Sequence, residues 1–265
     1  MDKDNIFKSC SFYLDDGDVI HVLIKDFVGD SLSISLNDND GVQEDDTEIT
    51  PYGELYTGDY GALYNWYAAA DSRNICSAGS HIPTKSEWDT LVAYLGGWAV
   101  AGGKLKEIGT VYWATDSGAT NEVGFNARGS GYRYESNGAF ISIHGYLWFH
   151  TAENYIIPNI YGRAIFNSTN MCGSWNITSE DERRRGTSLR TIKDSTILTH
   201  GQTGIYTGND GNIYPTICIG TQEWMACNLA ETEFRNGELI PNVEDNGAWA
   251  VLVTASMCYY NNVEI

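Results

Sequence analysis

The fold is decided by one stretch, residues 61–97, which reads GALYNWYAAADSRNICSAGSHIPTKSEWDTLVAYLGG. It joins an aromatic strand, expected to be buried, to the only strongly predicted helix. Thr84 and Glu87 have the spacing of a capping box, in which each side chain accepts a hydrogen bond from the backbone N–H of the other residue. Pro83 precedes them and blocks an earlier helical turn. The spacing therefore predicts that a helix begins directly after Thr84.

The apolar residues that follow have helical periodicity. They recur at positions i, i+3, i+4 and i+7 and form one stripe, made of Trp88, Leu91, Val92 and Leu95. Gly96 and Gly97 then provide the left-handed conformation that ends many helices. We expect a helix over about residues 85–95 whose Trp88 side lies against a core.

Composition favours strands over helices elsewhere in the chain. The 265 residues are enough for one large domain or two small ones. The chain has 28 glycines and 12% aromatic residues, and it carries a single long helical pattern. These features indicate short strands joined by tight turns. The expected fold class is α+β, with mostly short antiparallel strands and one clear amphipathic helix.

The charge of the chain is strongly negative and unevenly placed. A formal net charge of −19 argues against nucleic acid or an anionic membrane as a partner, because such surfaces would repel the protein. Residues 1–60 hold 15 acidic and 3 basic residues, a net charge of −12. We expect residues 1–50 to form a small acidic β module or attachment arm with strands in CSFYL, VIHVLI and SLSISL.

Several motifs in residues 60–193 are similar to one known family. They are GALYNWYAA, HIPTKSEWDTLVAYLGG, AGGKLKE (101–107), NEVGFNARGSGYR (121–133) and YGRA (161–164). This set resembles the Fibrobacter succinogenes major paralogous domain. The resemblance implies a C-type-lectin-like fold over residues 56–194, related to formylglycine-generating enzymes and to variable proteins diversified by retroelements. It also implies that Arg128 and Arg133 make internal hydrogen bonds.

A second block resembles the first half of the same family domain. It reads DGNIYPTICIGTQEWMACNLAETEFRNGELIPNVEDNGAW (210–249) and continues to CYYNN (258–262). In the family this half precedes the YNWY strand, whereas here it comes last. We expect 195–209 to be a linker and 210–265 to pack as the displaced half, either in its own chain or in a neighbouring chain. The block should contain strands in IYPTICIG, TQEWMACNL and CYY, with a short helix or turn in NLAETEF.

The centre of the chain is expected to be rich in strands. The pattern predicts strands in VYWAT (111–115), VGFNARGSGYRY (123–134) and AFISIHGYLWFHTA (139–152). Between the last two, Asn137 and Gly138 are typical of a type I′ hairpin turn, which requires positive φ at both central residues.

The sequence predicts a protein without enzymatic activity. No residue combination matches a nucleophile with its base, a phosphate-binding loop or a zinc motif. The related formylglycine-generating enzymes use two cysteines near the end of the domain, but Cys172 is the single cysteine between residues 140 and 193. We expect no catalytic residue and no cofactor. The six cysteines are interpreted as mostly free, buried thiols, with a Cys218–Cys227 disulfide as the alternative.

No metal site is expected either. The strings that come nearest to the calcium loops of C-type lectins are Ile157-Pro158-Asn159 and Ser174-Trp175-Asn176. Both lack the carboxylates that a hard cation requires. The hypothesis that remains is a binding surface without a metal.

The candidate binding surface lies in residues 154–176. In the retroelement-diversified proteins that the chain resembles, the matching strands and loop form the exposed variable surface. Aromatic, Asn and Ser side chains give rigid contact area and adaptable hydrogen bonds. The residues expected to face outward together are Tyr155, Asn159, Tyr161, Arg163, Asn167, Asn170, Trp175 and Asn176. The alternative is that Tyr161 and Trp175 are core residues and that the asparagines only complete turns.

The expected function is display or adhesion. The first residues, MDKDNIFKSCSF, lack the pattern of a signal peptide, and no segment is apolar enough to span a membrane. We therefore expect a bacteriophage virion component of a fibre, tail or capsid decoration, made in the host cytoplasm. Its lectin-like domain would bind a host-surface glycan or protein, its residues 1–50 would bind other virion proteins, and the chain would form a homo-oligomer. The alternatives are a purely structural virion component and a lectin-like protein of a bacterial cell surface.

Overall fold

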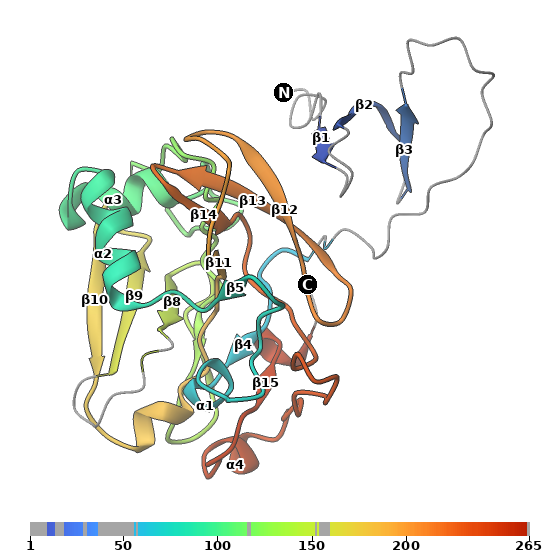
Figure 1. Cartoon of the computed structure of the whole chain (residues 1–265). Helices are drawn as coiled ribbons and strands as arrows, with labels where there is room; N and C mark the ends of the chain where they lie inside the picture. Colours follow the sequence, from blue (N-terminus) through green and yellow to red (C-terminus); the bar gives the residue numbers. More distant parts are fainter. Residues whose placement is uncertain are drawn as a thin grey trace. The chain divides into compact units, whose positions relative to one another are not determined.

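The computed structural model describes residues 10–13, 19–28, 31–36, 56, 58–115, 118–151, 153 and 160–263. The chain divides into two compact units, Met1–Tyr52 and Gly53–Ile265. The first unit contains β1 (Cys10–Tyr13), β2 (Val19–Val28) and β3 (Ser31–Leu36), which form one antiparallel sheet in the order β1-β2-β3 (Figure 1). These strands lie where the sequence predicts them.

The predicted helix is present in the second unit as α2 (Lys85–Tyr94). Its capping box is complete, since Thr84 N donates to Glu87 Oε2 at 2.8 Å and Glu87 N donates to Thr84 Oγ1 at 3.3 Å. Gly96 and Gly97 take the expected left-handed conformation, with φ of 96° and 100°. A further helix, α3 (Trp98–Leu105), follows directly. The local sequence signals are therefore confirmed at both ends of α2.

A five-stranded sheet combines segments from both halves of the second unit. Its order is β12 (Thr203–Thr207), β13 (Ile213–Ile219), β14 (Gln222–Met225), β11 (Ile192–Lys193) and β5 (Ser80–His81), and the neighbouring strands are antiparallel. In this structure the C-terminal block thus packs within its own chain. Residues 203–207, expected to belong to a linker, form β12 because Tyr206 packs on Tyr214 in the core.

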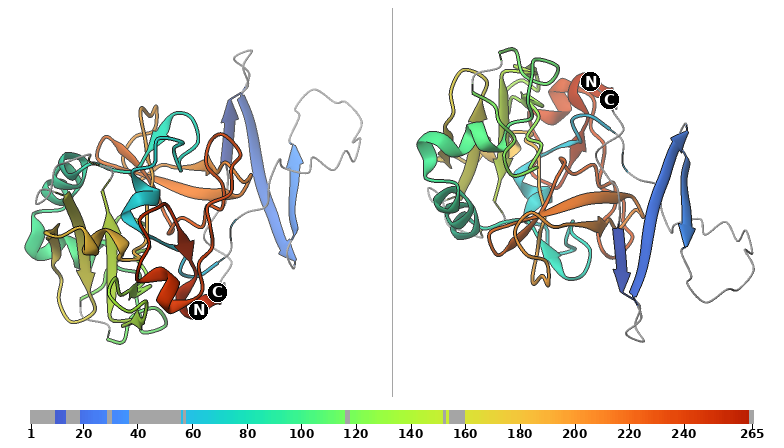
Figure 2. Two further views of the ribbon diagram at one scale, coloured as in Figure 1. Left: turned by 90° about the horizontal axis from the view of Figure 1, so that it is seen from below. Right: turned by 90° about the horizontal axis from the view of Figure 1, so that it is seen from above.

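A second sheet lies beside α2 and α3 (Figures 1 and 2). It consists of β10 (Cys172–Ile177), β9 (Ile160–Phe166) and β8 (Tyr146–His150), in that order. Two strand pairs complete the sheet structure: β15 (Met257–Cys258) with β4 (Leu63–Tyr64), and β6 (Tyr132–Arg133) with β7 (Phe140–Ile141). The short helical segments are α1 (Trp66–Ala69), α4 (Asn246–Trp249), η1 (Asp181–Arg184) and η2 (Tyr260–Asn262).

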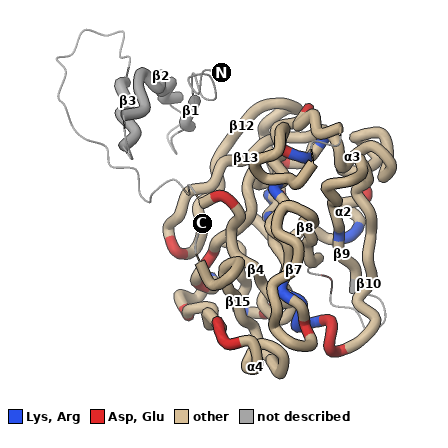
Figure 3. Tube along the Cα trace, turned by 180° about the vertical axis from the view of Figure 1, so that it is seen from behind, with Lys and Arg blue, Asp and Glu red and all other residues tan. Residues whose placement is uncertain are grey.

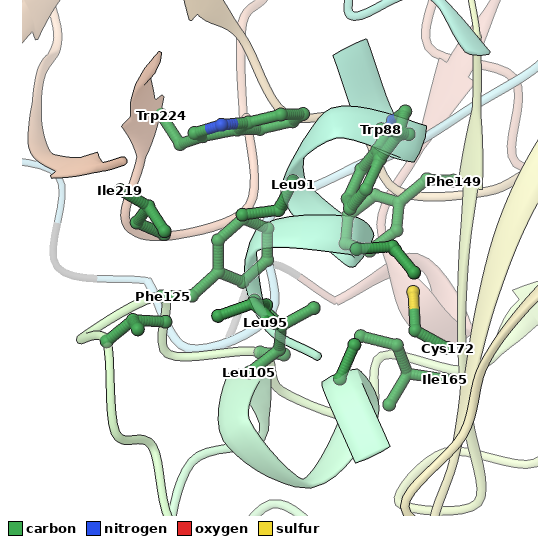
Figure 4. Close-up of a cluster of buried hydrophobic side chains, with 14 of the residues drawn as sticks. Trp88, Leu91, Leu95, Leu105, Phe125, Phe149, Ile165, Cys172, Ile219 and Trp224 are labelled. Carbon is green, nitrogen blue, oxygen red and sulfur yellow. The ribbon is translucent and has the colours of Figure 1, made fainter. Parts of the chain in front are cut away.

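The main core lies between these two sheets and the helices. Figure 4 shows its buried side chains: Trp88, Leu91 and Leu95 of α2, Leu105 of α3, Phe149 and Ile165 of the β8–β9 sheet, and Ile219 and Trp224 of the C-terminal block. The fold is mixed helix and sheet, with mostly antiparallel strands and few helices. Among the described helices, none has the length and apolar character that crossing a membrane requires.

Several local expectations are wrong. Of the strand expected over residues 123–134, only Tyr132–Arg133 forms one. Residues 111–115 are not a strand, because Trp113 is buried and its Nε1 donates to the carbonyl of Ala127 at 2.8 Å, which bends this segment into the core. Residues 228–234, where a short helix or turn is expected, form neither, and a turn follows at 235–236. The hairpin between β6 and β7 is present, but its turn is longer than a two-residue type I′ turn: Tyr134 N bonds to Ala139 O, and Gly138 has a φ of 68°.

The arginines and cysteines of the second unit behave as expected. Arg133 Nε donates to Gly138 O at 2.9 Å and its Nη2 donates to Glu244 O at 2.7 Å. Arg128 bonds to Glu107 and Asp59. The five cysteines of this unit are free, and four of them are buried: Cys76, Cys172, Cys218 and Cys258. The fifth, Cys227, is half-buried and is not bridged to Cys218.

Candidate functional site

The strand register separates the residues expected to form one surface. Tyr155 and Asn159 lie outside the described residues. In the β9–β10 pair, Arg163 is opposite Ser174 and Tyr161 is opposite Asn176, so these four side chains lie on one face of the sheet. Trp175 is opposite Gly162 and lies on the other face. The expectation that all eight residues face outward together is therefore wrong for Trp175.

Arg163 lies on the face of the β8–β9–β10 sheet that packs against α2, and its role there is structural. It is 3% exposed, forms an ion pair with Asp89 of α2, and donates from Nη1 to Ser174 Oγ at 2.8 Å. On the same side, Lys85 Nζ lies 5.4 Å from the centre of the Tyr161 ring. Arg163 is not available to a ligand, because its guanidinium fastens the sheet to the helix. Asn176 is exposed on this face.

Asn167 and Asn170 lie in the turn between β9 and β10. The carbonyl of Asn170 accepts a hydrogen bond from Gly103 N of α3 at 3.3 Å, and the Asn170 side chain packs beside Gly103 and Gly118. The carbonyl of Asn167 accepts from Thr115 Oγ1 at 3.1 Å. These residues hold the turn in place, as the alternative interpretation of the asparagines predicts, although Asn170 remains exposed.

The opposite face of the β8–β9–β10 sheet carries a continuous group of aromatic side chains. We call it the aromatic face, and it consists of five half-buried residues: Tyr132, Tyr146, Trp148, Phe166 and Trp175. The ring centres of Trp148 and Trp175 are 4.9 Å apart, those of Tyr132 and Trp148 are 5.3 Å apart, and those of Tyr146 and Phe166 are 5.5 Å apart. These spacings are those of favourable aromatic pairs.

Strand alternation and small residues produce this face. In β8 the core side chains are Leu147 and Phe149, so Tyr146 and Trp148 point to the other side. The middle of the face is occupied by the small residues Gly162, Ala164 and Gly173. Ala164 is opposite both Trp148 and Gly173 in the strand register. The Trp175 indole lies directly on Gly162, where a Cβ atom would be 2.2 Å from Trp175 Nε1.

A buried ion pair supports one side of the aromatic face. Arg185 and Glu135 are 9% and 6% exposed, and Nε and Nη2 of Arg185 donate to the two carboxylate oxygens of Glu135 at 2.8 and 2.7 Å. The Arg185 guanidinium carbon lies 5.0 Å from the Trp148 ring centre and 5.1 Å from that of Trp175. Such cation–π contacts hold the two indoles in fixed orientations.

His150 completes this support without carrying charge. Burial lowers the pKa of His150 to about 4, so the imidazole is neutral at pH 7. Its Nε2 donates to the carbonyl of Arg185 at 2.8 Å, and its ring centre lies 5.7 Å from that of Trp175. Alternation in YLWFH could have predicted Tyr146 and Trp148. No local pattern could have predicted Tyr132, Glu135 or Arg185, because they come from separate segments.

The described acidic residues, histidines and thiols are dispersed or buried. Within the described ranges, no group of three or more His, Cys, Asp and Glu residues is arranged to hold a metal ion. Burial raises the pKa of the Cys172 thiol to about 11 and that of Cys258 to about 12, which keeps both protonated near neutral pH.

In the second unit, basic and acidic residues lie close together at several places along the trace (Figure 3), as in the Arg184–Asp181 pair.

Comparison with known proteins identifies the family. The model of the Fibrobacter succinogenes major domain matches residues 27–194, which is more than half of the chain. The match includes α2, α3 and the whole β8–β9–β10 sheet, whereas the C-terminal block lies beyond it. No curated protein and no solved structure matches the chain. The protein belongs to the Fibrobacter succinogenes major domain family.

Proposed function

We propose that this protein is a non-enzymatic recognition protein that uses the aromatic face to bind a host-surface glycan or protein. The observation that carries the proposal is the row of half-buried rings of Tyr132, Tyr146, Trp148 and Phe166 on the sheet face opposite the main core. At the end of this row Trp175 packs against the buried Trp66 and Ile177. Trp and Tyr contribute disproportionately to binding energy at interfaces, because they bury a large area at a low cost in conformational entropy.

The aromatic face is also preorganised. The Glu135–Arg185 ion pair and Gly162 fix the positions of Trp148 and Trp175 before any ligand arrives. A surface that does not need to be ordered on binding loses less entropy, which favours affinity. Aromatic rings of this kind also stack on nucleic-acid bases, but such sites combine rings with a basic groove. The net charge of −19 favours a neutral or basic ligand instead.

Two further elements of the proposal come from the sequence. The first is the setting, a bacteriophage virion or, as the alternative, a bacterial cell surface. The second is the C-type-lectin-like character of the fold, in which a rigid scaffold would present the binding surface. A purely structural role in the virion is the competing function. It predicts that the protein is found in the particle but binds no host ligand.

The test compares substitutions on and off the aromatic face. Trp148→Ala and Tyr146→Ala should each reduce adsorption to host cells or envelope glycans, while Trp98→Ala should not. Trp98 is the matched control because it is 60% exposed and lies on α3, away from this face. A hot-spot residue is expected to lose more than ~1 kcal/mol of binding free energy on truncation.

Each variant must first show that it keeps the native unfolding transition. The triple change of Tyr155, Asn170 and Asn176 to Ala tests the surface expected from the sequence in the same assay. Adsorption that survives the two aromatic substitutions but disappears in the triple variant would move the site to residues 154–176, the surface expected from the sequence. Adsorption that depends on residues 1–50 alone would place it in the first unit.

A further inference from the structure

The outer edge of β12 is an open strand edge. β12 is the terminal strand of the five-stranded sheet and pairs with β13 on one side (Figure 1). Within the described part of the chain, no strand pairs with its other side. Open edges of this kind template the addition of another strand, and proteins usually block them with charges, proline or a bulge.

The hydrogen-bond pattern shows which residues face outward. Cys218 N donates to Gln202 O, and Gly208 N donates to Asn212 O. Hydrogen-bonded pairs alternate along an antiparallel ladder, so Gly204 and Tyr206 direct their backbone groups to β13. Thr203, Ile205 and Thr207 therefore direct theirs to the open side. Their side chains are exposed as well.

Among the described residues, this edge carries no charge, proline or bulge that would block pairing. The segment from Gly201 to Gly208 reads GQTGIYTG and contains no charged residue and no proline, in a chain whose net charge is −19. The register of β12 with β13 is continuous over five residues, without a bulge. Two of the outward residues are threonines and the third is isoleucine, and these β-branched types favour strand pairing.

We propose that β12 is a self-association edge, on which two copies of this protein pair antiparallel through Thr203–Thr207 about a twofold axis at Ile205. The outward residues are symmetric about Ile205, so this register sets Ile205 opposite Ile205 and Thr203 opposite Thr207. Each of these residue pairs exchanges both N–H···O bonds. The pairing joins two five-stranded sheets into one continuous sheet. It is independent of the ligand of the aromatic face.

The order of the residues favours a second copy over an unrelated strand. Cross-strand Thr–Thr pairs and pairs of β-branched residues are favourable contacts in antiparallel sheets. An isologous contact needs a surface that complements itself, and Thr203, Ile205 and Thr207 provide one. The strong net negative charge opposes association of two copies, so salt should strengthen the dimer by screening it.

Cysteine cross-linking of the full-length chain tests the register. In a Cys10→Ser background, Ile205→Cys should give a disulfide-linked dimer on mild oxidation, because residues in a hydrogen-bonded pair have Cα atoms about 5.5 Å apart. A mixture of Thr203→Cys and Thr207→Cys chains should cross-link far more than either variant alone. Leu239→Cys is the control, since Leu239 is 69% exposed and lies outside the sheet.

Sedimentation equilibrium tests the same contact without cross-linking. Wild-type protein should dimerise reversibly, and more strongly at 0.5 M than at 0.05 M salt. Ile205→Lys should weaken dimerisation at least tenfold, whereas Leu239→Lys should leave it unchanged. Ile205 is 43% exposed, so both variants should fold. The proposal would be overturned by a wild-type protein that stays monomeric. It would also be overturned if Thr203→Cys chains cross-link on their own as well as they do in the mixture with Thr207→Cys chains.

Discussion

The rings of Trp88 and Trp224 pack with their centres 4.7 Å apart in the main core. Trp88 belongs to α2, inside the segment that matches the family, and Trp224 belongs to β14 in the C-terminal block. Both side chains are fully buried. This contact shows that the core of the second unit is built jointly by the two segments, so neither can bury its apolar surface without the other.

Replacing Trp224 by Ala should therefore destabilise the whole second unit. Removal of a buried aromatic ring costs ~3–5 kcal/mol of unfolding free energy, since contacts are lost and a cavity remains. The matched change Trp98→Ala, at a position 60% exposed, should alter it by no more than ~0.5 kcal/mol. Urea unfolding followed by circular dichroism gives both values. Equal stabilities for the two variants would contradict the joint core.

Deleting residues 205–265 should have a larger effect. The deletion removes β13 and β14, so β11 keeps β5 as its partner but loses β14, and Trp88 loses the cover of Trp224. The remaining chain should lose its cooperative unfolding transition and bind a dye for exposed apolar surface. A truncated protein that unfolds at the temperature of the full chain would show that the C-terminal block is an independent addition.

The buried pair of Glu135 and Arg185 should be sensitive to loss of either charge. Glu135→Gln takes away the buried, two-bond partner of the Arg185 guanidinium and leaves it only Glu182, 3.4 Å away. Loss of one charge of a buried pair typically costs ~3–5 kcal/mol of unfolding free energy, and the remaining Glu182 contact places this variant toward the lower value. Asp181→Asn breaks the pair with Arg184 at a side chain that is 69% exposed, and it should cost less than ~1 kcal/mol. The two variants are compared by chemical unfolding at one pH and salt concentration.

Gly162 should be required for the shape of the aromatic face. Gly162→Ala places a methyl group against the Trp175 indole, and such overpacking typically costs ~1–3 kcal/mol. Gly173→Ala is the control on the same sheet, because its nearest neighbour, Phe166 Cε2, would lie 3.8 Å from the added Cβ. Gly162→Ala should also reduce ligand binding. If both variants bind and unfold like wild type, Trp175 is not held by this contact.

Stability should depend on pH through His81 and Glu87. His81 Nε2 lies 2.9 Å from Glu87 Oε1, and its Nδ1 lies 2.6 Å from Asp194 Oδ1. The hydrogen bond to Glu87 is the main reason that the pKa of His81 rises to about 9. It outweighs the effect of burial, which would lower this pKa. Burial alone would raise the pKa of Glu87, but its bonds to His81 and Thr84 lower it to about 2.

The two shifts define a pH window. The His81 contribution is complete below its unfolded pKa of ~6.5 and is lost as the pH rises through about 9. The Glu87 contribution is complete above ~4.5 and is lost as the pH falls through about 2. The stability difference between wild type and His81→Gln should thus be largest near pH 5–6 and shrink by pH 10. A difference that is constant with pH would exclude the ion pair as its cause.

The sequence by itself determined the parts of this protein whose signals are local. The helix α2, its capping box, its glycine stop and the strand pair β13–β14 each depend on interactions between residues only a few positions apart. The internal hydrogen bonding of Arg133 and the free thiols also agree with expectation. Hydrophobic periodicity and capping are properties of short segments, so they can be read without knowing what packs against them.

Only the tertiary structure decided which side chains share a surface. The β9–β10 register sends Arg163 toward α2 and Trp175 to the opposite face, because a strand reverses its side-chain direction at every residue. The aromatic face needs Tyr132 and Trp148 from different strands and Arg185 from beyond η1. β12 became an edge strand through pairing with β13, although its local sequence looked like a linker. Such contacts depend on the packing of distant segments, which no short pattern records.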